Sequence, residues 1–120
     1  MAQRAGKPSV STQVLARLLC RQGRYPDIEA MAKQLLMSQR TLKRRLQEEG
    51  RSFQTLLDQV RHQDSLRLLA NPDLAIKQVA QAVGYTDPAN FSRAFAKWTG
   101  MPPRDWRQEN ASKHETNGTD

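Results

Sequence analysis

The chain has 120 residues, a net charge of +7 and an apolar content of 38%, which suits one domain with a modest core and an anionic partner. Its single cysteine excludes an internal disulfide framework. The sequence contains no signal peptide and no apolar run of the roughly 20 residues that a membrane span needs, so we expect a cytoplasmic protein that does not enter a membrane.

The N-terminal part of the chain predicts a leader and a packing helix. Residues 1–9 are polar and basic and are expected to form a flexible leader. A helix is expected over residues 10–21, because Val14 and Leu18 recur on one face and Gly23 follows as a stop signal. Its expected role is packing.

Two short helices are predicted next, across a tight turn. Asp27 is a good N-cap for an amphipathic helix over residues 28–35. Ser38 is the N-cap of a second helix that runs to Glu49. Two such helices form a helix-turn-helix unit, whose second helix usually lies in the major groove of DNA.

A long helix is predicted over residues 53–70, where apolar residues recur at helical spacing until Asn71 and Pro72 end the pattern. A helix of roughly 18 residues is about 27 Å long. Neighbouring major-groove segments on one side of B-DNA are about 34 Å apart. We therefore expect this helix to hold the helix pairs on either side of it so that both can occupy neighbouring segments of the major groove.

A second pair of helices is predicted from Ile76 onward. The first ends at Gly84, and the second has Asp87 as its N-cap, Pro88 as its first residue and Gly100 as its stop. The apolar face of that second helix is expected to pack in the core and carries Phe91, Phe95 and Trp98. Beyond it, a short closing helix is expected around Trp106 and a disordered tail over residues 110–120.

The two helix pairs repeat one pattern. Ile28 aligns with Ile76 at an offset of 48 residues, and Ser38 aligns with Asp87 at an offset of 49. The first turn has Leu36 in place of the glycine of the second turn, and we therefore expect a different turn geometry there.

The stretch IKQVAQAVGYTDPANFSRAFAKWTGMPPRDWR resembles the second helix-turn-helix of the AraC family of bacterial transcription regulators, and MSQRTLKRRLQEEG is similar to the family's first recognition helix. The resemblance covers about residues 10–107. It implies an all-α fold of about seven helices, with helix-turn-helix subdomains at 10–52 and 72–109 and a long linker helix at 53–71.

What the resemblance implies about function is sequence-specific binding of double-stranded DNA by two recognition helices in adjacent major-groove segments. It also implies transcription regulation, more often activation, with RNA polymerase as a further partner. Members of the family usually carry an N-terminal sensing or dimerisation domain, although a few are freestanding. We expect this chain to be a monomeric DNA-binding portion of a larger regulator, with a freestanding protein as the alternative.

Charge is distributed in a way that agrees with two DNA-binding units. Residues 1–24 have five basic residues and no acidic one, residues 38–51 have five and two, and residues 85–107 have four and two. Residues 53–84 have three of each and are neutral. This pattern favours a directional electrostatic footprint over a uniform basic coat.

Six side chains are predicted to contact bases. On the first recognition helix, Leu42 and Leu46 define the buried side, and basic residues that can donate to guanine O6 and N7 lie opposite: Arg40, Lys43 and Arg44. On the second, the residues that match the groove-facing positions of the family are Ala89, Asn90 and Arg93. Asparagine can pair with adenine, arginine can contact guanine or phosphate, and alanine can only touch a thymine methyl.

A further set of hydroxyl and basic side chains is predicted to contact phosphates: Ser38, Thr41, Arg45, Ser92, Lys97 and Arg104. Such contacts fix the position of the protein on the duplex and carry no sequence information. For four of these residues a plain surface role is an equal alternative: Thr41, Ser92, Lys97 and Arg104. For Lys43 and Arg44 the alternative is a solvated basic face paired with Glu48 and Glu49.

An enzyme is not expected, because the sequence has no glycine-rich phosphate loop, no nucleophile with a nearby base and no paired carboxylates. We expect no cofactor and no metal, since neither His62 nor His114 has partners at ligand spacing. The alternative function is an all-helical protein-interaction module whose basic faces bind an acidic partner.

Overall fold

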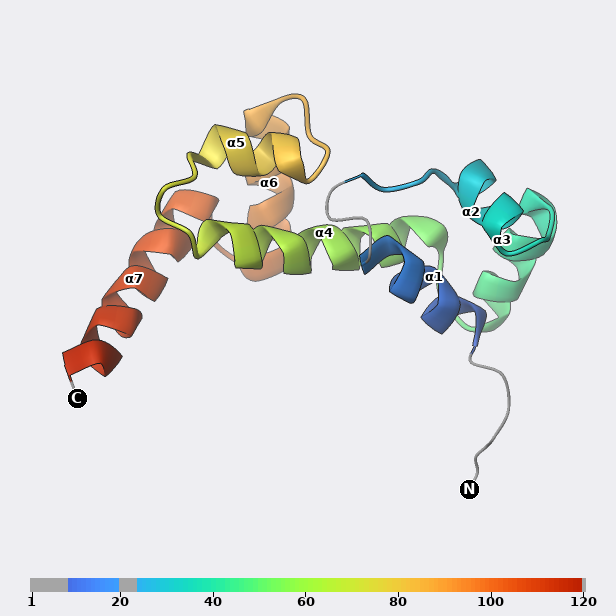
Figure 1. Ribbon diagram of the computed structural model, residues 1–120, viewed down its shortest axis with the longest axis horizontal. Helices are drawn as coiled ribbons and strands as arrows, with labels where there is room; N and C mark the ends of the chain where they lie inside the picture. Colours follow the sequence, from blue (N-terminus) through green and yellow to red (C-terminus); the bar gives the residue numbers. More distant parts are fainter. Residues whose placement is uncertain (1–8, 20–23, 120) are drawn as a thin grey trace, which may run out of the picture. The chain divides into compact units, whose positions relative to one another are not determined.

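The computed structural model describes residues 9–19 and 24–119 of the chain. This part contains seven α-helices and no strand, which confirms the all-α prediction (Figure 1). The helices are α1 (Val10–Leu19), α2 (Ile28–Gln34), α3 (Gln39–Glu48), α4 (Phe53–Leu69), α5 (Ile76–Ala82), α6 (Pro88–Thr99) and α7 (Pro103–Thr119). Residues 1–8 of the predicted leader and residues 20–21 of the predicted first helix lie outside the described residues.

The chain divides into two compact units, Met1–Val60 and Arg61–Asp120, and the division falls inside α4. Val60 is fully buried in the first core, and Leu69 is buried in the second. The sequence predicted α4 as a linker separate from both subdomains. Instead, each half of α4 supplies apolar side chains to one unit, because a short helix pair needs a further helix to cover its apolar face.

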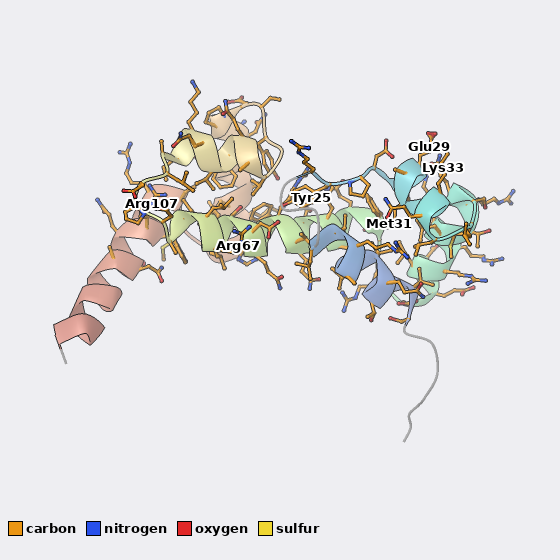
Figure 2. All side chains as sticks on the ribbon, viewed as in Figure 1. Tyr25, Glu29, Met31, Lys33, Arg67 and Arg107 are labelled. Carbon is orange, nitrogen blue, oxygen red and sulfur yellow. The ribbon has the colours of Figure 1, made fainter. Side chains whose placement is uncertain are left out.

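The core of the first unit lies between α1, α2, α3 and the first half of α4. Its fully buried side chains include Val14, Leu18, Met31, Leu42, Leu46 and Leu56. Met31 is labelled in Figure 2, where it lies among the helices of this unit. The packing role predicted for the first helix is thus confirmed by Val14 and Leu18, neither of which is exposed.

The second unit has an aromatic core built on α6. Phe91 and Phe95 are fully buried, and their rings lie 5.8 Å apart between centroids. Trp98 is half-buried and stacks on His62 of α4 at 5.7 Å. Aromatic pairs at such separations add to the stability that burial provides, and the three aromatic residues of α6 therefore serve the core, as their spacing predicted.

The predicted N-caps begin the helices as expected. The carboxylate of Asp27 accepts from the backbone N–H of Ala30 at 2.8 Å, and the hydroxyl of Ser38 accepts from that of Thr41 at 3.1 Å. Asp87 accepts from the N–H of Ala89 at 2.9 Å, with Pro88 as the first helical residue. Each cap satisfies a backbone donor that the first turn of a helix leaves unpaired.

The two helix-turn-helix turns have the same geometry, which corrects the expectation that they differ. Leu36 has a φ of 60° and Gly84 a φ of 90°, so both backbones are left-handed. In each turn, the N–H of this residue donates to the carbonyl three residues back, and the next N–H donates to the carbonyl five residues back. These two backbone hydrogen bonds require a left-handed residue in the turn, so leucine adopts the same conformation as glycine.

The chain after Asn110 also differs from the prediction. Where a disordered tail was expected, α7 continues to Thr119. Trp106 anchors the start of α7 by packing edge-on against Phe95 at 6.2 Å, and the side-chain amide of Asn110 donates to the carbonyl of Trp106 at 2.9 Å. Once a helix has nucleated, each further residue adds one hydrogen bond, so a polar sequence can extend it.

Candidate nucleic-acid interface

In the first unit, α3 presents a basic face to solvent. Leu42 and Leu46 are fully buried on its inner side, which fixes the rotation of the helix about its axis. The predicted base-contacting residues Arg40, Lys43 and Arg44 are exposed, as is Arg45. The first turn of α3, which Ser38 caps, also carries the positive end of the helix dipole, as the N-terminus of any α-helix does.

Two of the predicted phosphate ligands of this unit serve the cap of α3. The hydroxyl of Ser38 donates to the hydroxyl of Thr41 at 3.0 Å and accepts from the backbone N–H of the same residue. Ser38 is exposed and Thr41 is half-buried. Their first role in the free protein is therefore to hold the N-terminus of α3 in place.

Arg44 has an acidic partner on its own helix. Its Nε lies 4.0 Å from a carboxylate oxygen of Glu48, one turn further along, and both side chains remain mostly exposed. The expected alternative, a basic face paired with Glu48 and Glu49, is thus met for Arg44 and Glu48. An exposed pair of this kind is worth at most about 1 kcal/mol, so it leaves Arg44 available to DNA.

In the second unit, α6 exposes the predicted residues on the side opposite its aromatic core. Ala89, Asn90, Arg93 and Lys97 are exposed, whereas Phe91 and Phe95 are fully buried. A guanidinium nitrogen of Arg93 donates to the side-chain oxygen of Asn90. The sequence placed both residues on the outer face but gave no reason to expect this hydrogen bond.

Ser92 and Arg104 lie together, although they come from different helices. They line a hollow of about 360 Å³ in the second unit, with Ile76, Asp105, Pro102 and Pro103, the first residue of α7. Arg104 is exposed and Ser92 is half-buried. These two predicted phosphate ligands therefore border the same hollow of the second unit.

A second hollow, of about 540 Å³, lies beside the first recognition helix. It is lined by Lys43, Gln47 and Arg51 together with apolar residues, among them Leu46 and Phe53. Arg51 is exposed and lies beyond the helix that the sequence predicted up to Glu49. The signal that could have found it is a basic residue directly after Gly50, at the end of a basic helix.

The described part of the chain offers neither a metal centre nor a membrane-spanning helix. Within residues 9–19 and 24–119, no group of three or more His, Cys, Asp or Glu side chains is placed to hold a metal ion. No helix in this part of the chain is both long and apolar enough to span a membrane. Burial against Trp98 lowers the pKa of His62 below its usual 6.5, which favours the neutral imidazole.

Comparison with known proteins identifies a family. A family model described as a helix-turn-helix domain matches residues 31–109. The sequence is 41% identical over 97 residues to the ornithine utilization regulator of Pseudomonas aeruginosa, across 81% of this chain and 29% of that protein. The chain spans less than a third of the length of the first curated relatives that it matches: the matched part is 29% of one relative and 31% of the next.

Solved structures share the fold over most of the chain. The crystal structure of a DNA-binding transcriptional dual regulator from Escherichia coli K-12 has a TM-score of 0.84 and 30% identity, covering 92% of this chain and 99% of that one. The DNA-binding domain of AdpA, solved in complex with a target DNA, has a TM-score of 0.74 and 26% identity, covering 88% and 96%. With two helix-turn-helix units that match in sequence and in fold, this chain belongs to the AraC family of transcription regulators.

Proposed function

We propose that this chain binds double-stranded DNA sequence-specifically and regulates transcription, with α3 and α6 in adjacent major-groove segments. One observation carries the proposal. Each unit exposes the polar and basic face of its second helix, and buries the opposite face through Leu42 and Leu46 in one unit and Phe91 and Phe95 in the other. A helix held in this way can enter a major groove without losing its core contacts.

The proposed base contacts come from the exposed residues of these two helices: Arg40, Lys43 and Arg44 on α3, and Ala89, Asn90 and Arg93 on α6. The first helix offers more donors and is expected to contribute more of the sequence preference. Arg45, Lys97 and Arg104 are proposed as phosphate ligands, together with the hydroxyls of Ser38, Thr41 and Ser92.

The wider role remains a prediction. We infer that the full-length regulator carries a sensing or dimerisation domain and that the present portion acts as a monomer. The greater length of the relatives supports the extra domain. We further propose recruitment of RNA polymerase, activation of transcription, a cytoplasmic location beside the genome, and no catalytic activity, in line with relatives that are transcription regulators.

The test is a binding measurement on duplexes selected by this chain from a random pool. An enriched sequence motif is expected, together with a steep dependence of affinity on salt, since each neutralised phosphate contributes a log–log slope of about −0.9. Arg44→Ala is expected to weaken base preference in one part of the motif. Lys97→Ala should weaken binding to all sequences alike and reduce the salt slope by about one.

The rival function, a module that binds an acidic protein partner, gives a different result in the same experiment. A module of that kind would enrich no motif, and an acidic polypeptide such as polyglutamate would displace duplex DNA at low concentration. Either outcome would refute the proposed DNA recognition, because specific binding should exceed non-specific binding by about 10³-fold or more.

A further inference from the structure

Asn90 and Arg93 form one hydrogen-bonded unit on the exposed face of α6. A guanidinium group has five donors and no acceptor, so the atom of Asn90 that it meets must be the amide oxygen. The hydrogen bond therefore also fixes the orientation of the Asn90 amide, with its NH₂ group directed away from Arg93.

This arrangement changes what the pair can recognise. Asparagine recognises adenine by accepting from N6 with its oxygen while donating to N7 with its NH₂ group. In this protein, the oxygen of Asn90 already holds a charged donor. The Asn90 oxygen keeps one further lone pair, but every other free hydrogen-bonding group of the pair, the amide NH₂ and the rest of the guanidinium, is a donor. These donors match the two acceptors that guanine presents, O6 and N7, better than the donor and acceptor of adenine.

We propose that Asn90 is a positioning residue that orients Arg93, and that α6 selects a guanine at the base that Arg93 meets. The inference rests on the proposed DNA binding and adds to it the base preference of the second unit. It replaces the expectation from sequence alone that Asn90 pairs with adenine.

The packing of α6 and the chemistry of its exposed side chains support a fixed role for this pair. The buried rings of Phe91 and Phe95 hold α6 in one rotation, so the side chains three residues apart at 90 and 93 share the outer face. A long arginine side chain loses much rotamer freedom when it binds, and a hydrogen bond in the free protein reduces that loss. One turn further along the same exposed face, the ammonium group of Lys97 adds a hydrogen-bond donor and no acceptor, so it does not compete with Asn90 for Arg93.

The first unit holds its equivalent arginine differently. Arg44 aligns with Arg93 at an offset of 49 residues, but its partner is the carboxylate of Glu48. The residue that aligns with Asn90 is Thr41, whose hydroxyl accepts from Ser38 in the cap of α3. The hydrogen bond between an asparagine amide and the arginine is therefore found in the second unit and not at the aligned residues of the first. Its effect should be confined to the base pairs that α6 contacts.

The experiment is a parallel selection of duplexes from one random pool with the wild-type chain, Arg93→Ala and Asn90→Leu. The base that α6 recognises is the motif column that differs between wild type and Arg93→Ala. We expect guanine in that column for the wild type and loss of guanine in Arg93→Ala, where the released Asn90 amide should favour adenine. For Asn90→Leu we expect guanine with a preference reduced by about fivefold or more, near the lower end of the effect of one bidentate contact.

The base preference is the readout that a merely structural role of Asn90 would not change. Adenine in this column for the wild type, lost in Asn90→Leu, would overturn the inference, and so would an Asn90→Leu preference equal to that of the wild type.

Gln108→Ala, an exposed change on α7, is the matched control and should keep the wild-type motif. A pool without any enriched motif would instead refute the proposed DNA recognition itself, while equal circular dichroism spectra would show that the variants fold.

Discussion

Glu49, at the end of the first recognition helix, caps the start of α1 through Ser11. Its carboxylate accepts from the hydroxyl of Ser11 at 2.5 Å and from the backbone N–H of the same residue at 3.1 Å, and its other oxygen accepts from the N–H of Val10 at 3.0 Å. A negative charge at a helix N-terminus is favourable because unpaired N–H groups and the helix dipole meet there. The position of α3 in the first unit is thus tied to α1.

The pH dependence of stability should report this cap. The hydrogen bond from the Ser11 hydroxyl, with those from the backbone of Ser11 and Val10, lowers the pKa of Glu49 below its usual 4.5 despite opposing desolvation. A carboxylate with a lowered pKa stabilises the fold above its unfolded pKa, and the contribution disappears as pH falls through the folded pKa. Glu49→Gln should therefore cost about 1 kcal/mol at neutral pH, as loss of a cap does.

Urea unfolding followed by circular dichroism from neutral pH down to about pH 3 measures the effect as a difference between wild type and Glu49→Gln. The difference should shrink once the pH falls below about 4.5. Glu48→Gln, the neighbouring change outside the cap, serves as the control and should show a smaller pH-dependent difference. A constant difference between wild type and Glu49→Gln at every pH would contradict the prediction.

Leu36→Gly should stabilise the first unit. Leu36 has a left-handed backbone, which costs a residue with a Cβ roughly 1–2 kcal/mol, and its side chain is 91% exposed. Glycine removes that cost, but its greater conformational freedom in the unfolded chain costs about 0.5–1 kcal/mol, so the net gain in the free energy of unfolding lies between about 0 and 1.5 kcal/mol. A rise in the midpoint of thermal unfolding is the measurement.

Leu36→Ala separates backbone strain from the removal of an exposed leucine. Alanine keeps the Cβ and should leave stability nearly unchanged, so an equal gain in both variants would show that strain is not the cause. In the second turn the reverse change, Gly84→Ala, should destabilise. Gly84 has a φ of 90°, and an added Cβ would also lie 3.3 Å from a guanidinium nitrogen of Arg61.

Glu48→Gln should increase the affinity for DNA. The substitution releases Arg44 from a carboxylate 4.0 Å away and removes a negative charge from the face proposed to meet phosphates. Since an exposed ion pair contributes roughly 0.2–1 kcal/mol, affinity should rise by up to about fivefold. Titration of the selected duplex at two salt concentrations tests this, and unchanged affinity at low salt would count against a DNA contact by Arg44.

Arg107→Lys should destabilise the second unit. Arg107, labelled in Figure 2, extends from α7 and closes the end of α4. Its Nε donates to the carbonyl of Leu69 at 3.0 Å, and a terminal nitrogen donates to that of Asn71 at 3.3 Å. Lysine keeps the charge but cannot place two donors in a fixed fork. The expected loss is about 1.5 kcal/mol in urea unfolding, the lower end of the range for one hydrogen bond of a charged group, whereas Gln108→Ala should have almost no effect.

Much of the fold could be predicted because it depends on interactions between residues close in sequence. Three helices begin at side chains that accept a hydrogen bond from a backbone N–H two or three residues further along. These caps are Asp27 for α2, Ser38 for α3 and Asp87 for α6. The apolar spacing on α3 and α6 likewise identified the buried faces. The exposed positions of Arg44 and Arg93 followed from those faces, since burying one side of a helix exposes the other.

The sequence by itself therefore determined the all-α class, the two helix-turn-helix units and the outward basic faces, because caps and helical periodicity act within a few residues. Only the tertiary structure decided the division inside α4, the cap that Glu49 gives to α1 from 38 residues away and the length of α7. It also gave Leu36 the left-handed conformation of Gly84 and paired Arg93 with Asn90. These features depend on which residues far away in the sequence cover an apolar helix face, and on which of several possible acceptors a hydrogen-bond donor reaches. A local sequence pattern determines neither.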